Sequence, residues 1–157
     1  MLTESADIKE IMQRCYGSTK GCAKVLFPER FELPFSSLHE EIFKVLDDDS
    51  INRVVIAAPR GFGKTSLCTI AQPAKRILFK EKKFIVPISA TATNAVTQGE
   101  NLKRELMFNP MIQQLFGSIK AIRFRVTSGS PRVVRWLCHE ALGSRFVVTC
   151  LIAIDLI

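Results

Sequence analysis

Residues 58–65, Ala-Pro-Arg-Gly-Phe-Gly-Lys-Thr, constrain this chain more than any other segment. A short run rich in β-branched residues, 53–58, precedes them, and apolar residues at helical spacing follow from Thr65. The segment is close to the pattern GxxxxGK[ST] of phosphate-binding loops, with Ala58 at the first glycine position. Residues 58–65 are therefore called the P-loop segment below, and a strand, a tight turn and a helix are expected around them.

The residue types in this segment suit a nucleotide triphosphate. Small residues let successive backbone N–H groups converge on one anion, and the start of the following helix adds the positive end of its dipole. Lys64 is expected to reach the β- and γ-phosphates, and the Thr65 hydroxyl to ligate Mg²⁺. The sequence thus predicts ATP and Mg²⁺ as cofactors. The predicted nucleotide-contacting residues are Pro59, Arg60, Gly61, Phe62, Gly63, Lys64, Thr65 and Ser66.

Arg60 has two possible roles. As a cation beside the glycines it could contact the γ-phosphate as an internal arginine finger, which would make it catalytic together with Lys64. Equally, it could form a local salt bridge. The sequence leaves both open.

The remaining pattern predicts alternating helices and strands. Helices are expected at 7–16 and 19–27, and Ser37 with Glu40 predicts a capping box at the start of another. Strands are expected at 53–58 and 84–88, and helices from 65, interrupted at Pro73, and at 93–107. A strand, a glycine turn, a helix and a second strand are typical of an α/β domain with a parallel sheet.

Composition narrows the class of protein further. Lys and Arg number 22 against 15 Asp and Glu, a formal charge of +7 that favours phosphate-bearing partners. The five cysteines include no CxxC pair, which argues against a disulfide framework or a zinc site. The longest apolar run, 146–157, is too short to span a bilayer and is interrupted by Asp155. No membrane association is expected.

Two stretches resemble the large terminase subunits of tailed phages, the ATP-driven motors that package DNA. Residues 57–65 are similar to the family's variant Walker A, in which an arginine precedes the glycines and the first glycine is relaxed. Residues 88–95 and 100–106 are similar to the strand end and helix that follow it. The resemblance covers about residues 20–134. We assign the longer range 1–134 to the N-terminal part of a P-loop ATPase domain.

The resemblance implies a P-loop NTPase with a RecA-like three-layer core, incomplete here, and an RNase H-like nuclease domain that is absent from this sequence. Phe35 and His39 sit where the family has a stretch that helps hold the adenine. It also implies a ring of subunits on the portal protein, a small terminase subunit as partner, double-stranded DNA as substrate and a location in the host cytoplasm.

The C-terminal part departs from the family. A Walker B strand ending in paired acids is missing, because the run 151–155 ends in the single acid Asp155. Read one base earlier, the degenerate codons of 136–157 permit Arg-Gly-rich and Arg-Pro-Asp segments like those of the family. We therefore treat 135–157 as an anomalous tail produced by a frameshift near 133–136, or alternatively as a genuine divergent end. Weak ATP binding and little or no hydrolysis are expected.

Two other functions stay open. One is a different P-loop NTPase, such as a helicase-like protein. The other is a non-catalytic module that uses its basic residues on nucleic acid, with Lys75 and Arg76 among the available charges. Loss of DNA binding in a Lys75/Arg76 double alanine variant would favour the second.

Overall fold

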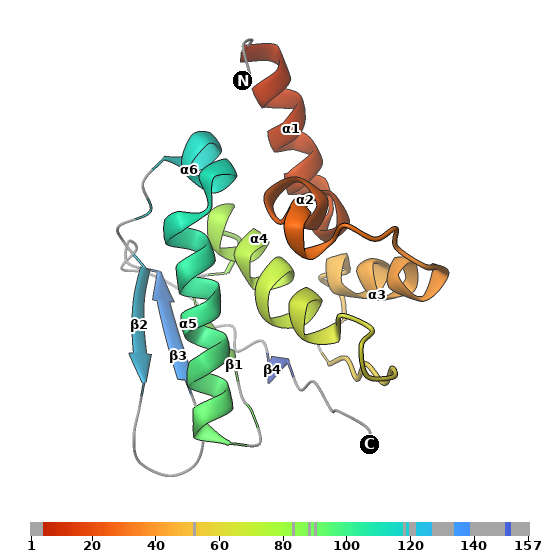
Figure 1. The fold of residues 1–157 in the computed structure, drawn as a ribbon, viewed down its shortest axis with the longest axis vertical. Coiled ribbons are helices and arrows are strands. Elements are labelled where there is room, and N and C mark those ends of the chain that lie inside the picture. Colours follow the sequence, from red (N-terminus) through yellow and green to blue (C-terminus); the bar gives the residue numbers. More distant parts are fainter. Residues whose placement is uncertain are drawn as a thin grey trace.

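The computed structural model describes residues 5–51, 53–82, 84–87, 89, 91–117, 119, 122–126, 134–138 and 150–151. Its main body is a set of packed helices, and α5 contacts β2 and β3 on one side and η2 on the other (Figure 1). The helical elements are α1 (Ser5–Gly17), α2 (Thr19–Leu26), η1 (Pro28–Arg30), α3 (Ser37–Asp47), η2 (Ser66–Ala71), α4 (Gln72–Leu78), α5 (Ala92–Phe108) and α6 (Pro110–Phe116). The helices expected at 7–16, 19–27 and 93–107 are therefore present as α1, α2 and α5.

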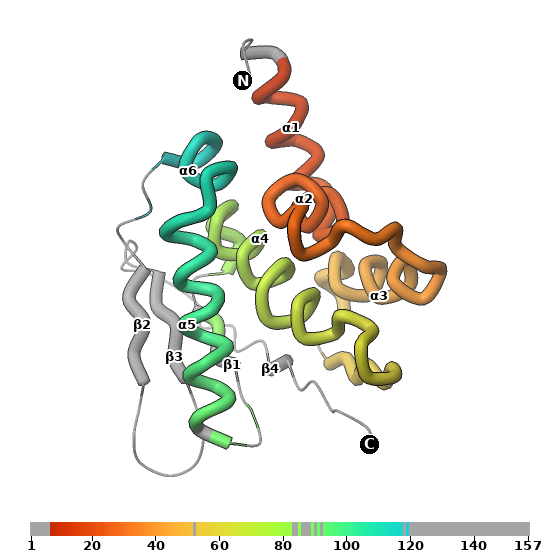
Figure 2. The backbone as a smooth tube through the Cα atoms, in the orientation of Figure 1, coloured from red at the N-terminus to blue at the C-terminus, as the bar shows by residue number. Residues whose placement is uncertain are grey.

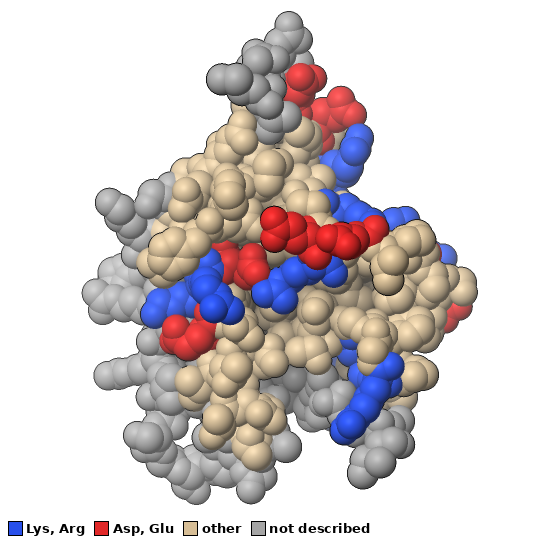
Figure 3. Space-filling model, in the orientation of Figure 1, with Lys and Arg blue, Asp and Glu red and all other residues tan. Residues whose placement is uncertain are grey.

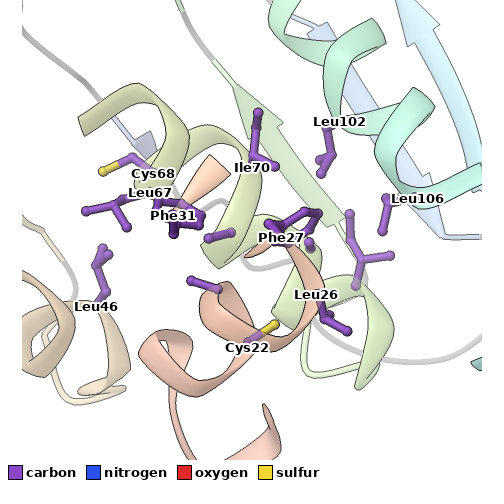
Figure 4. Packing of buried hydrophobic residues seen from close by; sticks show 14 of the residues in the cluster. Cys22, Leu26, Phe27, Phe31, Leu46, Leu67, Cys68, Ile70, Leu102 and Leu106 are labelled. Atoms are coloured by element: carbon purple, nitrogen blue, oxygen red, sulfur yellow. The ribbon is translucent and has the colours of Figure 1, made fainter. Parts of the chain in front are cut away.

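A single apolar cluster holds these helices together (Figure 4). Leu26 and Phe27 come from the end of α2, and Leu102 and Leu106 project towards them from α5. Leu67 belongs to η2, so the cluster reaches the helix that follows the P-loop segment. Because Leu67 comes just after residues 58–65, its contacts in this core hold the C-terminal end of the P-loop segment against the helices.

Pro73 lies where the helix after the P-loop segment changes its hydrogen-bonding pattern. The first part, η2, is a π-helical segment, in which the N–H of Gln72 donates to the carbonyl of Leu67, five residues earlier. Pro73 follows in the first turn of α4, and because Ala71 and Gln72 keep helical φ and ψ angles, its missing N–H removes one backbone hydrogen bond from an otherwise continuous helix. Widened turns of this kind are rare and are found frequently at functional sites.

The strands are short and mostly antiparallel. They are β1 (Phe84–Pro87), β2 (Ile122–Val126), β3 (Val134–Cys138) and β4 (Cys150–Leu151), in the order β2-β3-β1-β4. β3 pairs antiparallel with both β2 and β1, and the only parallel pairing between these strands joins β1 to the two residues of β4. The predicted α/β fold, a RecA-like three-layer core with a parallel sheet, is therefore wrong. The described body is mostly helical instead.

The expected strand at 53–58 is the origin of that error. In this segment only Ile56 makes a bridge-type pairing, and the rest is irregular. Val55 is 73% exposed, although a strand inside a parallel sheet would be covered on both faces. A β-branched run favours a strand only where neighbouring strands are available to pair with it, and apart from the single pairing at Ile56 the described part of the chain shows no strand pairing here.

Charged side chains form a buried network between α2, α3 and α4. Asp47, the last residue of α3, accepts hydrogen bonds from the backbone N–H and the hydroxyl of Thr19, and lies 3.4 Å from Lys75 Nζ. Arg76 pairs with Glu81 at 2.6 Å and donates to the carbonyl of Leu46. The side chains of Lys75 and Arg76 are only 6% and 7% exposed.

The availability of Lys75 and Arg76 for DNA is therefore a wrong prediction. Both cations are enclosed and paired inside the protein, so a double alanine variant would test folding instead of nucleic-acid contact. Across the centre of the face shown in Figure 3, basic and acidic side chains lie beside one another, and a separate basic group lies at the lower right. None of the described helices combines the length and apolar character needed to cross a membrane.

Candidate phosphate-binding site

The P-loop segment connects the region after α3 to η2 and α4 (Figure 2). Two of its residues, Gly61 and Gly63, have positive φ angles of 80° and 71°. Only glycine adopts this conformation without steric cost, since a Cβ atom would crowd the residue's own backbone. Space is not the reason, because a Cβ at either position would meet nothing within 4 Å. The glycines are therefore needed for the curl of the loop itself.

Lys64 directly follows this glycine turn. The residue is 5% exposed, and its Nζ donates to the carbonyl oxygens of Ala58 and, at 3.0 Å, Pro59. The ammonium thus points back at the start of the loop. The contact of Lys64 with phosphate stays a prediction.

The helix begins directly after the glycines. The carbonyl of Gly63 accepts the N–H of Leu67 at 2.9 Å, so the chain is helical from Lys64 onward. Thr65 is exposed in the first turn of this helix. Ser66 is half-buried and lines the cleft described below. Both hydroxyl-bearing residues lie next to the glycine turn, and Ser66 lines the cleft whereas Thr65 does not, so their contacts with Mg²⁺ and phosphate stay predictions.

Arg60 is exposed in the turn before Gly61. Within the described part of the chain it makes no ion pair, so the local salt bridge considered from the sequence is not observed there. Its role towards a γ-phosphate stays a prediction.

His39 contacts the P-loop segment directly. Its imidazole stacks on the ring of Phe62, with centroids 4.4 Å apart and planes 13° from parallel. Its Nε2 lies 3.0 Å from the carbonyl oxygen of Phe62, and its Nδ1 lies 3.1 Å from the backbone nitrogen of Ser36. The capping box of α3 is therefore Ser36 with His39, one residue earlier than the predicted pair of Ser37 and Glu40.

A cleft of about 430 Å³ opens beside the loop, within the size range of small-molecule sites. One side is formed by Gly61, Phe62 and Gly63, and the opposite side by the connection between α2 and α3. The lining residues are Glu29, Arg30, Phe31, Glu32, Leu33, Pro34, Phe35, His39, Gly61, Phe62, Gly63, Ser66 and Leu67. Of the predicted nucleotide-contacting residues, the cleft brings Gly61, Phe62, Gly63 and Ser66 together with Phe35 and His39, whereas Pro59, Arg60, Lys64 and Thr65 do not line it.

The connection that forms the far wall is held from α2 by Lys24. Its Nζ donates to the carbonyls of Phe31, at 2.6 Å, and Leu33, at 3.0 Å, and lies 4.9 Å from the centroid of the Phe35 ring. At the other end of the wall, Arg30 pairs with Glu105 of α5 at 2.6 Å. Sequence reasoning missed these wall residues. In the sequence, the only sign that the connection between α2 and α3 is ordered but irregular was the presence of Pro28 and Pro34 next to aromatic residues.

Cys68 lies in η2 below the loop and is buried. Burial raises the pKa of its thiol to about 11, and the nearby Lys64 ammonium offsets part of that effect. The thiol is therefore neutral at pH 7 and is not an activated nucleophile. The described residues also contain no group of three or more His, Cys, Asp or Glu that could hold a metal ion by itself.

The structure describes only part of residues 135–157, the segment that the sequence identifies as an anomalous tail. β3 and β4 include some residues of 135–157, whereas 139–149 and 152–157, and with them Asp155, lie outside the described residues. The predicted absence of a Walker B strand and the frameshift hypothesis both stay predictions.

No protein-family model, curated protein sequence or solved structure matches this chain.

Proposed function

We propose that the chain binds the triphosphate of ATP in the P-loop segment and the nucleoside in the adjoining aromatic cleft. One observation carries this proposal. Gly61 and Gly63, both with positive φ, make a turn directly before the buried Lys64, whose ammonium donates to the carbonyls of Ala58 and Pro59, and the same two glycines line a cleft of about 430 Å³. A buried positive charge beside a glycine turn and the start of a helix is an arrangement that favours phosphate.

The contacts follow from the loop geometry. A phosphate at the curl would meet the Lys64 ammonium, which now donates to two carbonyls of the same loop. Charge-assisted hydrogen bonds to phosphate oxygens are stronger than bonds to neutral carbonyls, so the exchange favours the anion. The exposed Thr65 would hold Mg²⁺ jointly with phosphate oxygens and water, since Mg²⁺ needs few protein ligands.

On this basis we further propose that the chain is the ATP-binding part of a terminase large subunit that packages double-stranded DNA. The portal protein, the small subunit and other copies of the chain would be its partners in the host cytoplasm. This step depends on the similarity of residues 57–65 to the family's Walker A and does not depend on the fold. Binding is expected to be weak and hydrolysis slight, because the sequence offers no apolar strand that ends in two acids.

Replacing Lys64 tests the proposal. We expect Lys64→Met to weaken ATP·Mg²⁺ binding by about tenfold to hundredfold, because one or two charge-assisted hydrogen bonds to phosphate are lost. Isothermal titration with ATP, ADP, AMP and adenosine gives the affinities. The loss should be large for ATP and small for adenosine, which has no phosphate.

Lys44→Met is the matched control. Lys44 is exposed on α3 and does not line the cleft, and its replacement changes the net charge by the same amount. Equal affinities of wild type and Lys64→Met for ATP, with both proteins folded by circular dichroism, would show that the P-loop assignment is wrong. An equal loss in Lys44→Met would show that only the net charge matters.

A further inference from the structure

We infer that His39 is a positioning residue that fixes the shape of the P-loop segment, and that it does so instead of contacting the base. This inference deepens the proposed function and rests on it. Its starting point is that the imidazole reaches from the first turn of α3 to Phe62, the residue between Gly61 and Gly63.

Both ring nitrogens of His39 are already used inside the protein. The backbone N–H of Ser36 donates to Nδ1, so Nδ1 is an acceptor and the proton of the neutral ring resides on Nε2. Nε2–H then donates to the carbonyl of Phe62 at 3.0 Å. A base in the cleft would therefore find no unused nitrogen on this ring with which to form a hydrogen bond.

The faces of the ring are also engaged. Phe62 stacks on the imidazole, and Phe35 lies 5.6 Å away at a tilt of 50°. Phe35 in turn makes an edge contact with Phe43, which belongs to the buried core. A continuous series of aromatic contacts therefore runs from the core to the middle of the P-loop segment.

This connection matters because the loop needs an external anchor. Glycine-rich backbone has many accessible conformations, and ordering it on binding costs conformational entropy. A hydrogen bond to the Phe62 carbonyl and a stack on its ring hold the residue between the two glycines before any ligand arrives. Preorganisation of this kind increases affinity by lowering the ordering cost, and here the gain would appear in phosphate binding.

Two neutral replacements separate the proposed role from a merely structural one. In His39→Gln, the amide oxygen can accept the Ser36 N–H and the amide nitrogen can donate to Phe62, as glutamine does at this position of a capping box. His39→Met has similar length and no charge but can do neither. Affinities of wild type and both variants for ATP·Mg²⁺ and for adenosine are measured by titration.

We expect His39→Met to bind ATP about fivefold more weakly, equivalent to the net value of one hydrogen bond, and adenosine within about twofold of wild type. His39→Gln should bind ATP within about twofold of wild type. Equal weakening of ATP and adenosine in His39→Met would overturn the inference, because it would indicate a contact with the base. Weakening of ATP binding in His39→Gln as great as in His39→Met would also overturn it.

A second measurement needs no nucleotide. Chymotrypsin cleaves after phenylalanine, so nicking at Phe62, followed by mass spectrometry, reports release of that ring from His39. We expect nicking to be about fivefold faster in His39→Met than in wild type and nearly unchanged in His39→Gln, because cleavage follows local opening. Equal rates in all three proteins would refute the positioning role. If wild type fails to bind ATP, the proposed function falls, and the nicking rates still decide whether His39 positions the loop.

Discussion

Asp47→Ala is expected to lower the free energy of unfolding by about 3 kcal/mol, at the lower end of what breaking a buried ion pair costs. The carboxylate of Asp47 accepts from the backbone N–H of Thr19 at 2.9 and 3.0 Å, from the Thr19 hydroxyl and from the Ser18 hydroxyl at 3.2 Å. Thr19 is fully buried, so its donors would lose their acceptor without gaining water.

The same carboxylate helps to neutralise a buried cation. Lys75 Nζ lies 3.4 Å from Asp47 and 3.5 Å from Glu81, so removing Asp47 leaves it a single partner at that distance. The loss should therefore affect three helices at once, because Asp47 ends α3, Thr19 begins α2 and Lys75 belongs to α4. Urea denaturation followed by far-ultraviolet circular dichroism measures the change.

Glu10→Ala is the control for this measurement. Glu10 also pairs with a cation, Arg14, at 3.2 Å, but both side chains are more than half exposed. An exposed pair of this kind contributes about 0.5 kcal/mol or less. If Asp47→Ala cost no more than Glu10→Ala, the buried network would not be a stabilising element of this fold.

Leu102→Ala is expected to destabilise the protein by a similar amount, about 3 kcal/mol. Leu102 has no exposed surface and projects from α5 into the cluster that also contains Leu26 and Ile70 (Figure 4). Shortening it removes buried apolar contacts and leaves a cavity that the neighbouring helices can fill only in part. α5 contacts β2 and β3 on one side and η2 on the other. We therefore expect the lost packing to weaken the position of η2 as well, the helix that follows the P-loop segment.

Met107→Ala on the same helix provides the comparison. Met107 is 41% exposed, and alanine is at least as good a helix former, so a change within about 0.5 kcal/mol is expected. Thermal and urea unfolding of the two variants should differ clearly. Equal stabilities would mean that α5 is not packed against the core through Leu102.

Local sequence signals predicted local structure well. Helix start and stop signals located α1 and α2, apolar spacing located α5, Pro73 lies where the helical hydrogen-bonding pattern changes from η2 to α4, and Gly61 and Gly63 are the two loop residues with positive φ. Each of these features is decided by residues within one or two turns of chain. Steric freedom of glycine and the missing N–H of proline act wherever they occur.

Features that depend on distant partners were not predictable in the same way. The β-branched residues of 53–58 favour a strand, but Val55 is exposed because no neighbouring strand covers it in the described structure. The burial of Lys75 depends on acids from α3 and from the turn after α4. His39 was expected near a base from resemblance alone, whereas its contact with Phe62 depends on how α3 packs against the loop.

The most direct test of phosphate binding is a ¹⁵N NMR titration of the full chain with ATP·Mg²⁺, and with adenosine for comparison. Weak complexes are accessible to this measurement, and each amide reports its own surroundings. We expect ATP to shift the amide signals of Gly61, Gly63 and Lys64 most strongly, because their N–H groups belong to the glycine turn and the lysine directly after it, while adenosine leaves them nearly unchanged. Unchanged signals at these residues under saturating ATP, or shifts confined to other surfaces, would contradict phosphate binding by the P-loop segment.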